Sequence, residues 1–101
     1  MKKVSDLDFH VECAEGLVLV DFYADWCGPC RALKPVLLEL SQEMEDVKFV
    51  AVDVDESPSL VREFGVTAMP TVYLIKDGKQ VAMFRGGRQK EYVKDMIMEH
   101  K

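Results

Sequence analysis

Short apolar runs alternate with segments of helical spacing along the chain. The runs at 17–23 and 47–54 are apolar almost without interruption, which is typical of strands that are covered on both faces. Buried strands of this kind indicate a parallel sheet with helices on each side. Two further strands are expected at 71–75 and 80–84, joined through 76–79, whose sequence Lys-Asp-Gly-Lys is typical of a hairpin turn.

The first helix is expected between Ser5 and Gly16. Ser5 is a favourable N-cap, because its side-chain oxygen can accept a hydrogen bond from a free N–H of the first turn. Leu7, Val11 and Ala14 recur at helical spacing, which indicates an amphipathic helix with these side chains on one face.

Three more helices are expected further along the chain. One follows residue 30 and contains Pro35, which should kink it, since proline has no N–H and clashes with the preceding turn. Another begins at Ser57-Pro58, an N-cap followed by proline in the first helical position, and stops at Gly65. The last follows Gly86-Gly87. The order α-β-α-β-α-β-β-α predicts an α/β fold with a mixed sheet between helices, its first two strands joined by a right-handed crossover.

Length and charge narrow the possible classes of protein. A chain of 101 residues has the size of one domain, so we expect a single domain over 1–101. The net charge is −5 and the basic residues form no run, which argues against binding to nucleic acid or to an anionic membrane. The longest apolar run, 17–20, is too short to span a bilayer, and the chain starts without a signal-peptide pattern. Three cysteines are too few for a secreted disulfide scaffold, so the expected compartment is the cytoplasm.

Two of the cysteines, Cys27 and Cys30, are spaced for a reversible disulfide. Residues three apart on a helix lie on one face with Cβ atoms about 5–6 Å apart, which suits a disulfide. The closed loop is so short that the bond would add only about 2 kcal/mol of stability, so it is easily opened. Cys27 lies near the free N–H groups and positive dipole of the helix start, which favour its thiolate, although Pro29 offers no N–H. Cys30, one turn into the helix and expected to be less exposed, suits the role of resolving thiol.

Asp21 is the one charged residue in the apolar run 17–23. Burial of an unpaired carboxylate is costly, so the pKa of Asp21 should rise above the usual range of an aspartate. The alternative is an aspartate at a strand end that is simply solvated. The cysteine pair that follows favours the first interpretation. Arg31 and Lys34, beyond the pair, are expected to be solvated on the helix face, the alternative being that their charge modestly favours the thiolate.

The segment from Val20 to Cys30, Val-Asp-Phe-Tyr-Ala-Asp-Trp-Cys-Gly-Pro-Cys, resembles the active-site segment of the thioredoxin family. The resemblance continues in the same order along almost the whole chain. The other matching positions are Pro35, Val52-Asp53-Val54-Asp55, Ala68-Met69-Pro70-Thr71, Gly78 and Gly86. A lone Cys-x-x-Cys would be a weak signal, but Trp-Cys-Gly-Pro-Cys with a downstream Met-Pro-Thr is highly specific.

The resemblance implies a thioredoxin fold, a central mixed sheet of four to five strands flanked by helices on both faces, and the activity of a general protein-disulfide reductase. Cys27 would attack a substrate disulfide as a thiolate, and Cys30 would resolve the mixed disulfide. Asp21 would be the acid/base that helps deprotonate Cys30 through water. Gly28-Pro29 resembles the dipeptide of the reducing members, whereas oxidising and isomerising relatives, the alternative function, usually carry other residues there.

Further residues are implied to shape the site and to bind substrate. Trp26 would cover the site, and Met69 with Pro70 would form the facing wall. If the Met69–Pro70 bond is cis, as in the family, the Met69 main chain can pair with an extended substrate segment, as an added strand does. Gly86 would belong to an apolar patch with few charges that suits varied protein substrates. The other members of this patch are Trp26, Gly28, Pro29, Ala68, Met69 and Pro70.

The resemblance also implies partners. A thioredoxin reductase would supply electrons to the cysteine pair, and disulfide-containing proteins would receive them. No bound cofactor is expected, since the electrons are carried by the two sulfurs. The chain is expected to act as a monomer.

The sequence departs from the family pattern in two places. Many members carry a lysine at the position of Ala51, near the buried aspartate, and alanine cannot provide that charge. The pKa of Asp21 should therefore depend more on desolvation than on coupling to a second charge. Only residues 1–4 remain for the family's first edge strand, so four or five strands are expected.

A structural zinc module is the alternative from a different class. His10-x-x-Cys13 and Cys27-x-x-Cys30 could supply four ligands. However, the thirteen residues between the pairs include a buried strand, which would place the pairs at different ends of the sheet. Cys13 is otherwise expected to be an inert packed side chain, the alternative being a regulatory or dimer-forming thiol.

Overall fold

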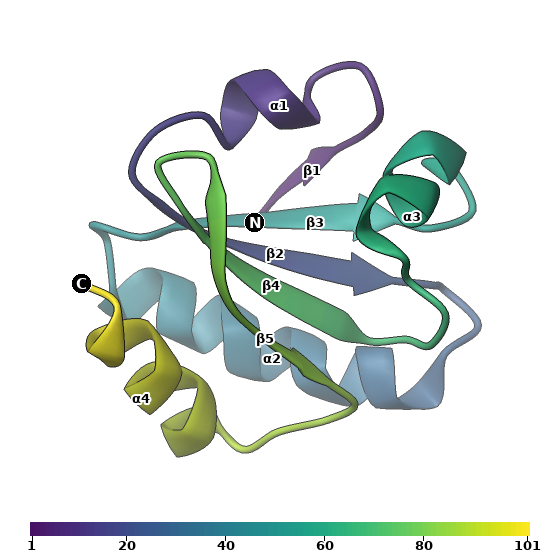
Figure 1. Ribbon diagram of the computed structural model, residues 1–101. Coiled ribbons are helices and arrows are strands. Elements are labelled where there is room, and N and C mark those ends of the chain that lie inside the picture. The colour runs from purple at the N-terminus through teal and green to yellow at the C-terminus, as the bar shows by residue number, and fades with distance from the viewer.

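Strands and helices alternate along residues 1–101, all of which the computed structural model describes (Figure 1). The elements are, in chain order, β1 (Lys2–Val4), α1 (Phe9–Glu12), β2 (Leu17–Tyr23), α2 (Gly28–Glu43), β3 (Lys48–Asp53), α3 (Pro58–Phe64), β4 (Thr71–Lys76), β5 (Lys79–Arg85) and α4 (Lys90–Glu99). The strands form one sheet in the order β1-β3-β2-β4-β5. β1, β3 and β2 are parallel, whereas β4 runs antiparallel to β2 and β5 antiparallel to β4. The predicted mixed sheet is confirmed, and the short β1 gives it five strands.

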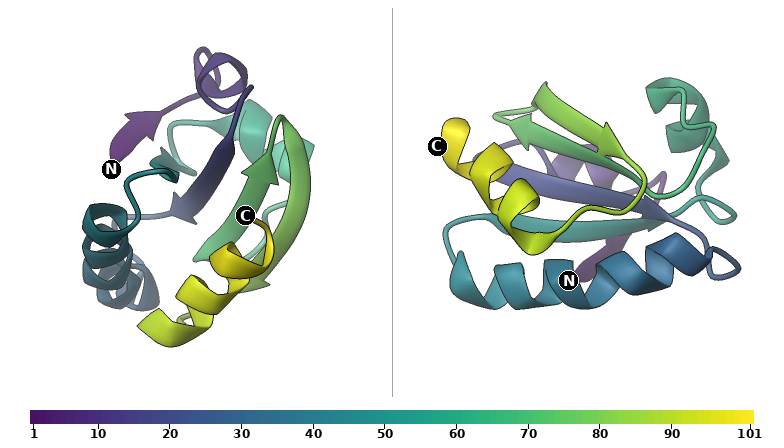
Figure 2. Two further views of the ribbon diagram at one scale, coloured as in Figure 1. Left: turned by 90° about the vertical axis from the view of Figure 1, so that its left-hand side faces the viewer. Right: turned by 90° about the horizontal axis from the view of Figure 1, so that it is seen from below.

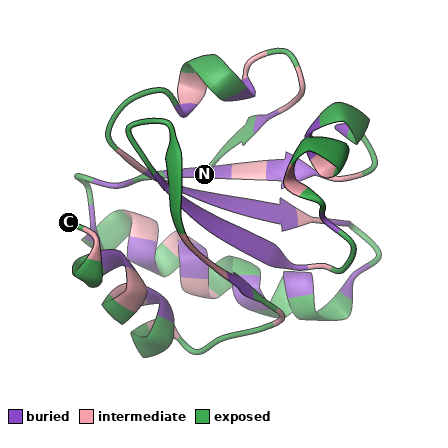
Figure 3. Ribbon diagram, viewed as in Figure 1, coloured by how far each residue is buried: buried purple, intermediate pink, exposed green.

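The helices cover the sheet from both sides (Figures 1 and 2). α1 and α3 lie over one face, and α2 and α4 lie over the other. The buried apolar side chains divide in the same way, into one cluster of 12 residues on each side, so the sheet separates two cores of equal size. The central strands β2, β3 and β4 are mostly buried, whereas most of the edge strand β5 and the outward helix faces are exposed (Figure 3). None of the helices has the length and apolar character that crossing a membrane requires.

β2 is the central strand, and its side chains alternate between the two cores. Val20 and Phe22 pack in the cluster on the α1 and α3 side, whereas Leu19 packs with Leu37 of α2. Successive side chains of a strand point to opposite faces, so Asp21, two residues after Leu19, points towards α2. The strand therefore directs one carboxyl group at the helix that carries the cysteine pair.

The first helix is much shorter than predicted. Ser5 is not its N-cap, because α1 begins only at Phe9 and the Ser5 hydroxyl accepts no N–H of the first turn; instead the Ser5 N–H donates to Oδ1 of Asp8 at 2.7 Å. Asp8 is the residue that precedes α1. The Asp8 carboxylate therefore accepts a main-chain N–H from the preceding segment, and residues 6–8 form a turn instead of helix.

The predicted buried face of this segment is also wrong. Leu7 and Val11 are 95% and 79% exposed, and Ala14 is exposed as well. Phe9 and Cys13, which have the same four-residue spacing, are buried in their place. Two apolar sets at helical spacing compete here, and the larger Phe9 ring fills the core between α1, α3 and the sheet.

The predicted bounds of α3 and of the hairpin turn are confirmed, whereas α2 begins at Gly28, before the expected start after residue 30. α2 contains Pro35, and α3 starts directly after Ser57 and stops at Gly65, whose φ of 63° is the left-handed conformation typical of a helix end. Asp77 and Gly78 join β4 to β5 with φ values of 49° and 83°, as a two-residue hairpin turn requires.

Candidate redox-active site

The turn between β2 and α2 brings two cysteines together. Cys27 is the N-cap of α2, and its Sγ accepts the N–H of Cys30 at 3.1 Å. The free N–H groups at this end of the helix carry the positive end of its dipole, which favours a thiolate on Cys27 when the pair is reduced. Pro29 lies in the first helical turn, where a missing N–H removes no helical hydrogen bond.

Cys27 and Cys30 form a disulfide, with their Cα atoms 5.3 Å apart. This separation lies within the range that a disulfide requires, as the three-residue spacing predicts. The two residues are 5% and 4% exposed and pack with Ala24 in a small cluster. The two exposures are nearly equal, so the expectation that Cys30 is clearly less exposed than Cys27 is not met, and burial alone does not distinguish an attacking sulfur from a resolving one.

The loop that precedes β4 faces the disulfide. Its Met69–Pro70 peptide bond is cis, and the Met69 carbonyl oxygen lies 3.6 Å from the Sγ of Cys27. Gly86, directly after β5, has a φ of 80° and donates its N–H to the Pro70 carbonyl at 2.8 Å. Neither the N–H nor the C=O of Met69 makes a hydrogen bond to another main-chain group. The loop therefore presents a donor and an acceptor beside the disulfide, where an extended peptide could pair with them.

An apolar surface surrounds the disulfide. Trp26 is 65% exposed, and its indole N–H donates to Oδ2 of Asp55 at 3.1 Å. Three other members of the predicted patch, Gly28, Pro29 and Ala68, are exposed. Pro70 is buried, so its ring lies beneath this surface. The structure thus brings the two halves of the predicted patch, from positions 26–29 and 68–70, to one end of the sheet.

Asp21 is buried on the α2 side of the sheet. It is 3% exposed, and its Oδ1 has no hydrogen-bond partner. Burial raises the pKa of Asp21 to about 7, and the positive charge of Lys34 acts in the opposite direction. A simply solvated aspartate at a strand end does not fit this burial. A carboxyl group with such a pKa can accept and return a proton near neutral pH.

Asp21 and Cys30 line the same cavity, whose volume is about 440 Å³. Lys34 and Ala51 are part of its wall as well. A cavity of this volume has room for water, and the unpartnered Asp21 oxygen gives water a polar group to bind. Water could therefore connect the carboxyl group to the Cys30 thiol.

Ala51 leaves space beside this carboxyl group. In the register of the parallel strands, Ala51 is the neighbour of Asp21 on one side and of Lys3 on the other. Lys3 forms an ion pair with Glu56. Ala51 places no charge beside Asp21, and desolvation is the main cause of the raised pKa, as the alanine predicts.

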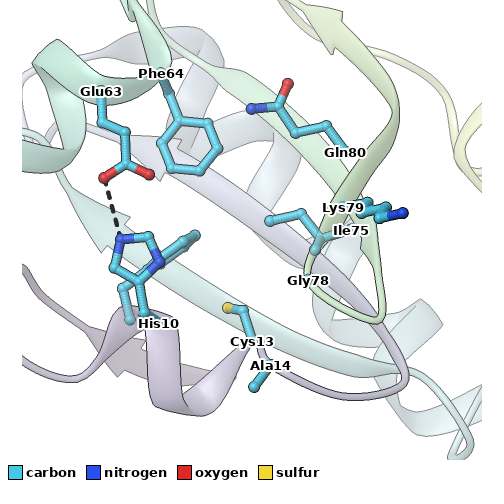
Figure 4. A pocket seen from close by; sticks show the side chains of 10 residues that line it. His10, Cys13, Ala14, Glu63, Phe64, Ile75, Gly78, Lys79 and Gln80 are labelled. Atoms are coloured by element: carbon cyan, nitrogen blue, oxygen red, sulfur yellow. Dashed lines mark hydrogen bonds and ion pairs between the residues drawn. The ribbon is translucent and has the colours of Figure 1, made fainter.

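Cys13 lies in a separate pocket between α1, α3 and the β4–β5 hairpin (Figure 4). Burial raises the pKa of its thiol to about 11, so the thiol is protonated near neutral pH, as expected of an inert packed side chain. At the same pocket, Nε2 of His10 lies 3.1 Å from Oε1 of Glu63. His10 and Cys13 thus belong to one pocket, and Cys27 and Cys30 to another cluster, so the four residues of the zinc alternative are not brought together.

Two residues at the site are not found by sequence reasoning. Asp55 lies 29 positions after Trp26, in a segment expected only to end a strand, and nothing in the sequence links the two. Lys34 is exposed, as expected, but it also lines the cavity that contains Asp21. A signal for Lys34 does exist, because a residue four positions after Cys30 on a helix lies on the same face.

A disulfide that can alternate with two thiols is the working part of a thiol-disulfide oxidoreductase, and the fold and the site together define this class. Comparison with known proteins gives the family. The thioredoxin family model matches residues 1–99. The thioredoxin of Bacillus subtilis is 43% identical over 99 residues, covering 97% of this chain and 95% of that protein. The chain belongs to the thioredoxin family.

Two further relatives agree with this assignment. The thioredoxin of Listeria monocytogenes is 45% identical over 101 residues, covering 99% of this chain and 98% of that protein. The X-ray structure of Fasciola hepatica thioredoxin matches with a TM-score of 0.89 and 39% identity, and the match covers 100% of both chains. The predicted thioredoxin fold is confirmed.

The predicted function is confirmed with the family. The protein is a protein-disulfide reductase whose Cys27–Cys30 pair alternates between disulfide and dithiol. Membership implies, in general terms, a reductase that supplies electrons and disulfide-containing substrates that receive them. Neither the isomerase-like alternative nor the zinc alternative is better supported.

Proposed function

We propose that the protein reduces substrate disulfides in two exchange steps. The Cys27 thiolate attacks one sulfur of the substrate disulfide, so that a Cys27–substrate disulfide forms and the other substrate sulfur leaves as a thiolate. Cys30 then loses its proton and attacks the Sγ of Cys27, which releases the second substrate sulfur and forms the Cys27–Cys30 disulfide. Two electrons pass to the substrate, and a thioredoxin reductase restores the dithiol.

Asp21 is the acid/base of the second step in this proposal. The observation that carries it is the single cavity that Asp21 and Cys30 both line. The ionised carboxyl group accepts the Cys30 proton through water, and a pKa of about 7 leaves a substantial ionised fraction at neutral pH. The Asp21→Asn variant should therefore resolve the mixed disulfide more slowly, measured by rapid mixing with a disulfide substrate. Unchanged resolution rates across pH 6 to 9 would remove Asp21 from the mechanism.

The substrate is proposed to bind as an extended segment along the Met69–Pro70 loop. Its main chain pairs with the unpaired N–H and C=O of Met69, as an added strand pairs with a sheet edge. The Met69 carbonyl oxygen is 3.6 Å from the Sγ of Cys27, so this pairing would place the substrate disulfide beside the attacking sulfur. Trp26 and Gly86 border the bound segment, and the apolar patch accepts varied side chains.

The wider context is part of the same proposal. We expect one thioredoxin domain over residues 1–101, acting as a monomer in the cytoplasm and without a bound cofactor. The two sulfurs carry the electrons themselves, which supports a mechanism without a cofactor. Size-exclusion chromatography with light scattering would test the monomer, and a mass near twice 11.5 kDa would contradict it.

The reduction potential of the Cys27–Cys30 pair separates the reductant from its isomerase-like alternative. It can be measured by equilibration in graded dithiothreitol buffers, with Trp26 fluorescence as the readout. The established reference values are about −270 mV for thioredoxin and about −180 mV for protein disulfide isomerase. A value close to the first supports the reductant. A value near or above the second would move the chain to the oxidising or isomerising relatives despite Gly28-Pro29.

A further inference from the structure

We propose that Lys34 is a positioning residue for the second exchange step: from one helical turn beyond Cys30, its ammonium group favours the ionised, proton-accepting form of Asp21 across the cavity that the three residues share. This inference deepens the proposed function and rests on the role of Asp21 given there. Lys34 would act only through the charge state of Asp21, without contact to the substrate or the reacting sulfurs.

The placement of Lys34 follows from two elements of the fold. Cys30 and Lys34 are four residues apart on α2, so their side chains lie on the same face of that helix. Asp21 points from β2 towards this face, and all three residues line one cavity of about 440 Å³. The proton acceptor, the thiol and a positive charge therefore meet around one water-accessible space.

The two strands beside β2 place no charge next to Asp21. β3 contributes the uncharged Ala51, and β4 places Val72 beside Asp21 in the register. Several other charged or titratable residues line the cavity. The N-terminal segment contributes Met1, with its amino group, and Lys3; Tyr23 comes from β2 and Asp25 from the turn after it; α2 contributes Cys30, Arg31 and Lys34.

The two other side-chain cations of the cavity, Lys3 and Arg31, are engaged elsewhere. Lys3 is ion-paired with Glu56, and the Arg31 guanidinium donates to the Asp25 carbonyl oxygen at 2.9 Å. Lys34 forms no ion pair and no side-chain hydrogen bond with the rest of the chain. Its ammonium group is therefore the side-chain cation left free to respond to the charge on Asp21.

The direction of the effect follows from electrostatics. Desolvation raises the pKa of Asp21 to about 7, and the charge of Lys34 is the one influence that lowers it. Removing this charge should raise the pKa further, so that fewer molecules carry the carboxylate at neutral pH. The relative loss of ionised Asp21 should be largest below pH 7. It should vanish at higher pH, where Asp21 is ionised with or without Lys34. Because Lys34 is exposed, solvent screens the interaction and the change should be modest.

The direct test is the titration of Asp21 itself. The carboxyl carbon of Asp21 would be followed by NMR between pH 4 and 10 in the oxidised protein, the state in which Cys27 and Cys30 are bonded. Lys34→Met should raise the pKa of Asp21 by roughly half a unit, and Lys34→Arg should restore it because the charge returns. Lys79→Met is the matched control: it removes an exposed lysine at the β4–β5 turn and should leave the titration unchanged. An unchanged Asp21 titration in Lys34→Met, or an equal rise in Lys79→Met, would overturn the inference.

The kinetic test separates this inference from the proposed function. Resolution rates would be measured across pH 6 to 9 for the wild type, Lys34→Met and Asp21→Asn. We expect the pH profile of Lys34→Met to move to higher pH, by as much as the Asp21 titration moves, with the plateau rate kept. If Asp21→Asn slows resolution but Lys34→Met leaves the profile in place, only the role of Lys34 is overturned. If Asp21→Asn resolves at the wild-type rate, the role of Asp21 fails, and that of Lys34 fails with it.

Discussion

The indole N–H of Trp26 donates a hydrogen bond of 3.1 Å to Asp55, although 29 residues separate the two in the sequence. Trp26 is 65% exposed, so packing alone leaves the ring free to move. Asp55 is itself held, because its N–H donates to Oδ1 of Asp53 at 2.9 Å. The segment after β3 therefore fixes the orientation of the aromatic ring next to Cys27.

Asp55→Ala should weaken substrate reduction without unfolding the protein. A hydrogen bond of this kind contributes about 0.5–1.5 kcal/mol, so kcat/KM for an insulin-type disulfide substrate should fall roughly two- to ten-fold. Asp55→Asn, which keeps an acceptor oxygen, should lose less. The steady-state fluorescence anisotropy of Trp26 should fall in the alanine variant. The prediction is contradicted if Asp55→Ala has the anisotropy and the kcat/KM of the wild type.

The raised pKa of Asp21 predicts an unusual dependence of stability on pH. The carboxyl group goes from its ordinary value of 3.8 to about 7 on folding, so the folded protein binds this proton more tightly than the unfolded chain. Its contribution to the free energy of unfolding should therefore be greatest below pH 4, should decline between about pH 4 and pH 7, and should stay low above that. The full decline is at most about 4 kcal/mol.

Asp21→Asn should remove this decline. Denaturant unfolding at pH 5 and pH 8 would measure it, and the variant should be more stable than the wild type at pH 8. Asp25→Asn, which changes an exposed aspartate in the following turn, is the matched control and should keep the wild-type dependence. The prediction is wrong if Asp21→Asn and the wild type lose the same stability between the two pH values.

Cys30→Ser should trap the covalent intermediate. Without the resolving thiol, the disulfide between Cys27 and the substrate has no internal sulfur to displace it, so it should accumulate. Mass spectrometry after mixing with a disulfide substrate should show the adduct on Cys27. Cys27→Ser should form none, and Cys13→Ala, which changes a buried and protonated thiol, should behave like the wild type. An adduct on Cys30 in the Cys27→Ser variant would show instead that Cys30 is the attacking thiol and Cys27 the resolving one.

Gly86→Ala should disturb the loop that faces the disulfide. The φ of Gly86 is 80°, which costs a residue with a Cβ roughly 1–2 kcal/mol, although no neighbouring atom blocks the added methyl group. Relief of this strain would move the N–H of residue 86, which donates to the Pro70 carbonyl and so holds the substrate-binding loop in place. The KM for a disulfide substrate should therefore rise, and the free energy of unfolding should fall. Gly87→Ala is the control, since Gly87 has no positive φ and open space around it. Similar losses in both variants, by denaturant unfolding and by KM, would show that the bond to Pro70 is unimportant.

Most of the site can be predicted from the sequence because its key groups belong to local motifs. The three-residue spacing of Cys27 and Cys30 fixes their relative position on one helix, and the continuous apolar run around Asp21 predicts its burial. Both properties depend on a few neighbouring residues. The same holds for Gly65 and for the Asp77-Gly78 turn, where the backbone conformation itself selects the residue type.

The remaining features depend on contacts between distant segments. The contact between Trp26 and Asp55 exists because the turn after β2 and the end of β3 meet at one edge of the sheet. The buried face of the first helix is a second feature that the sequence alone does not determine. Leu7 and Val11, which are exposed, have the same four-residue spacing as the buried Phe9 and Cys13. Periodicity gives no way to choose between two such faces, and the core formed with α3 decides.

The direction of β4 has a consequence for how the site is assembled. β4 runs against β2, so its first residue lies next to the end of β2, and Met69 is brought close to Cys27 although 42 residues separate them. A six-residue strand spans roughly 20 Å, and the same β4 laid parallel to β2 would begin that far from the disulfide. The antiparallel direction of β4 therefore brings Met69 to Cys27 without a long connecting loop. It places the two walls of the redox site at the adjoining ends of two neighbouring strands, β2 and β4, of one sheet.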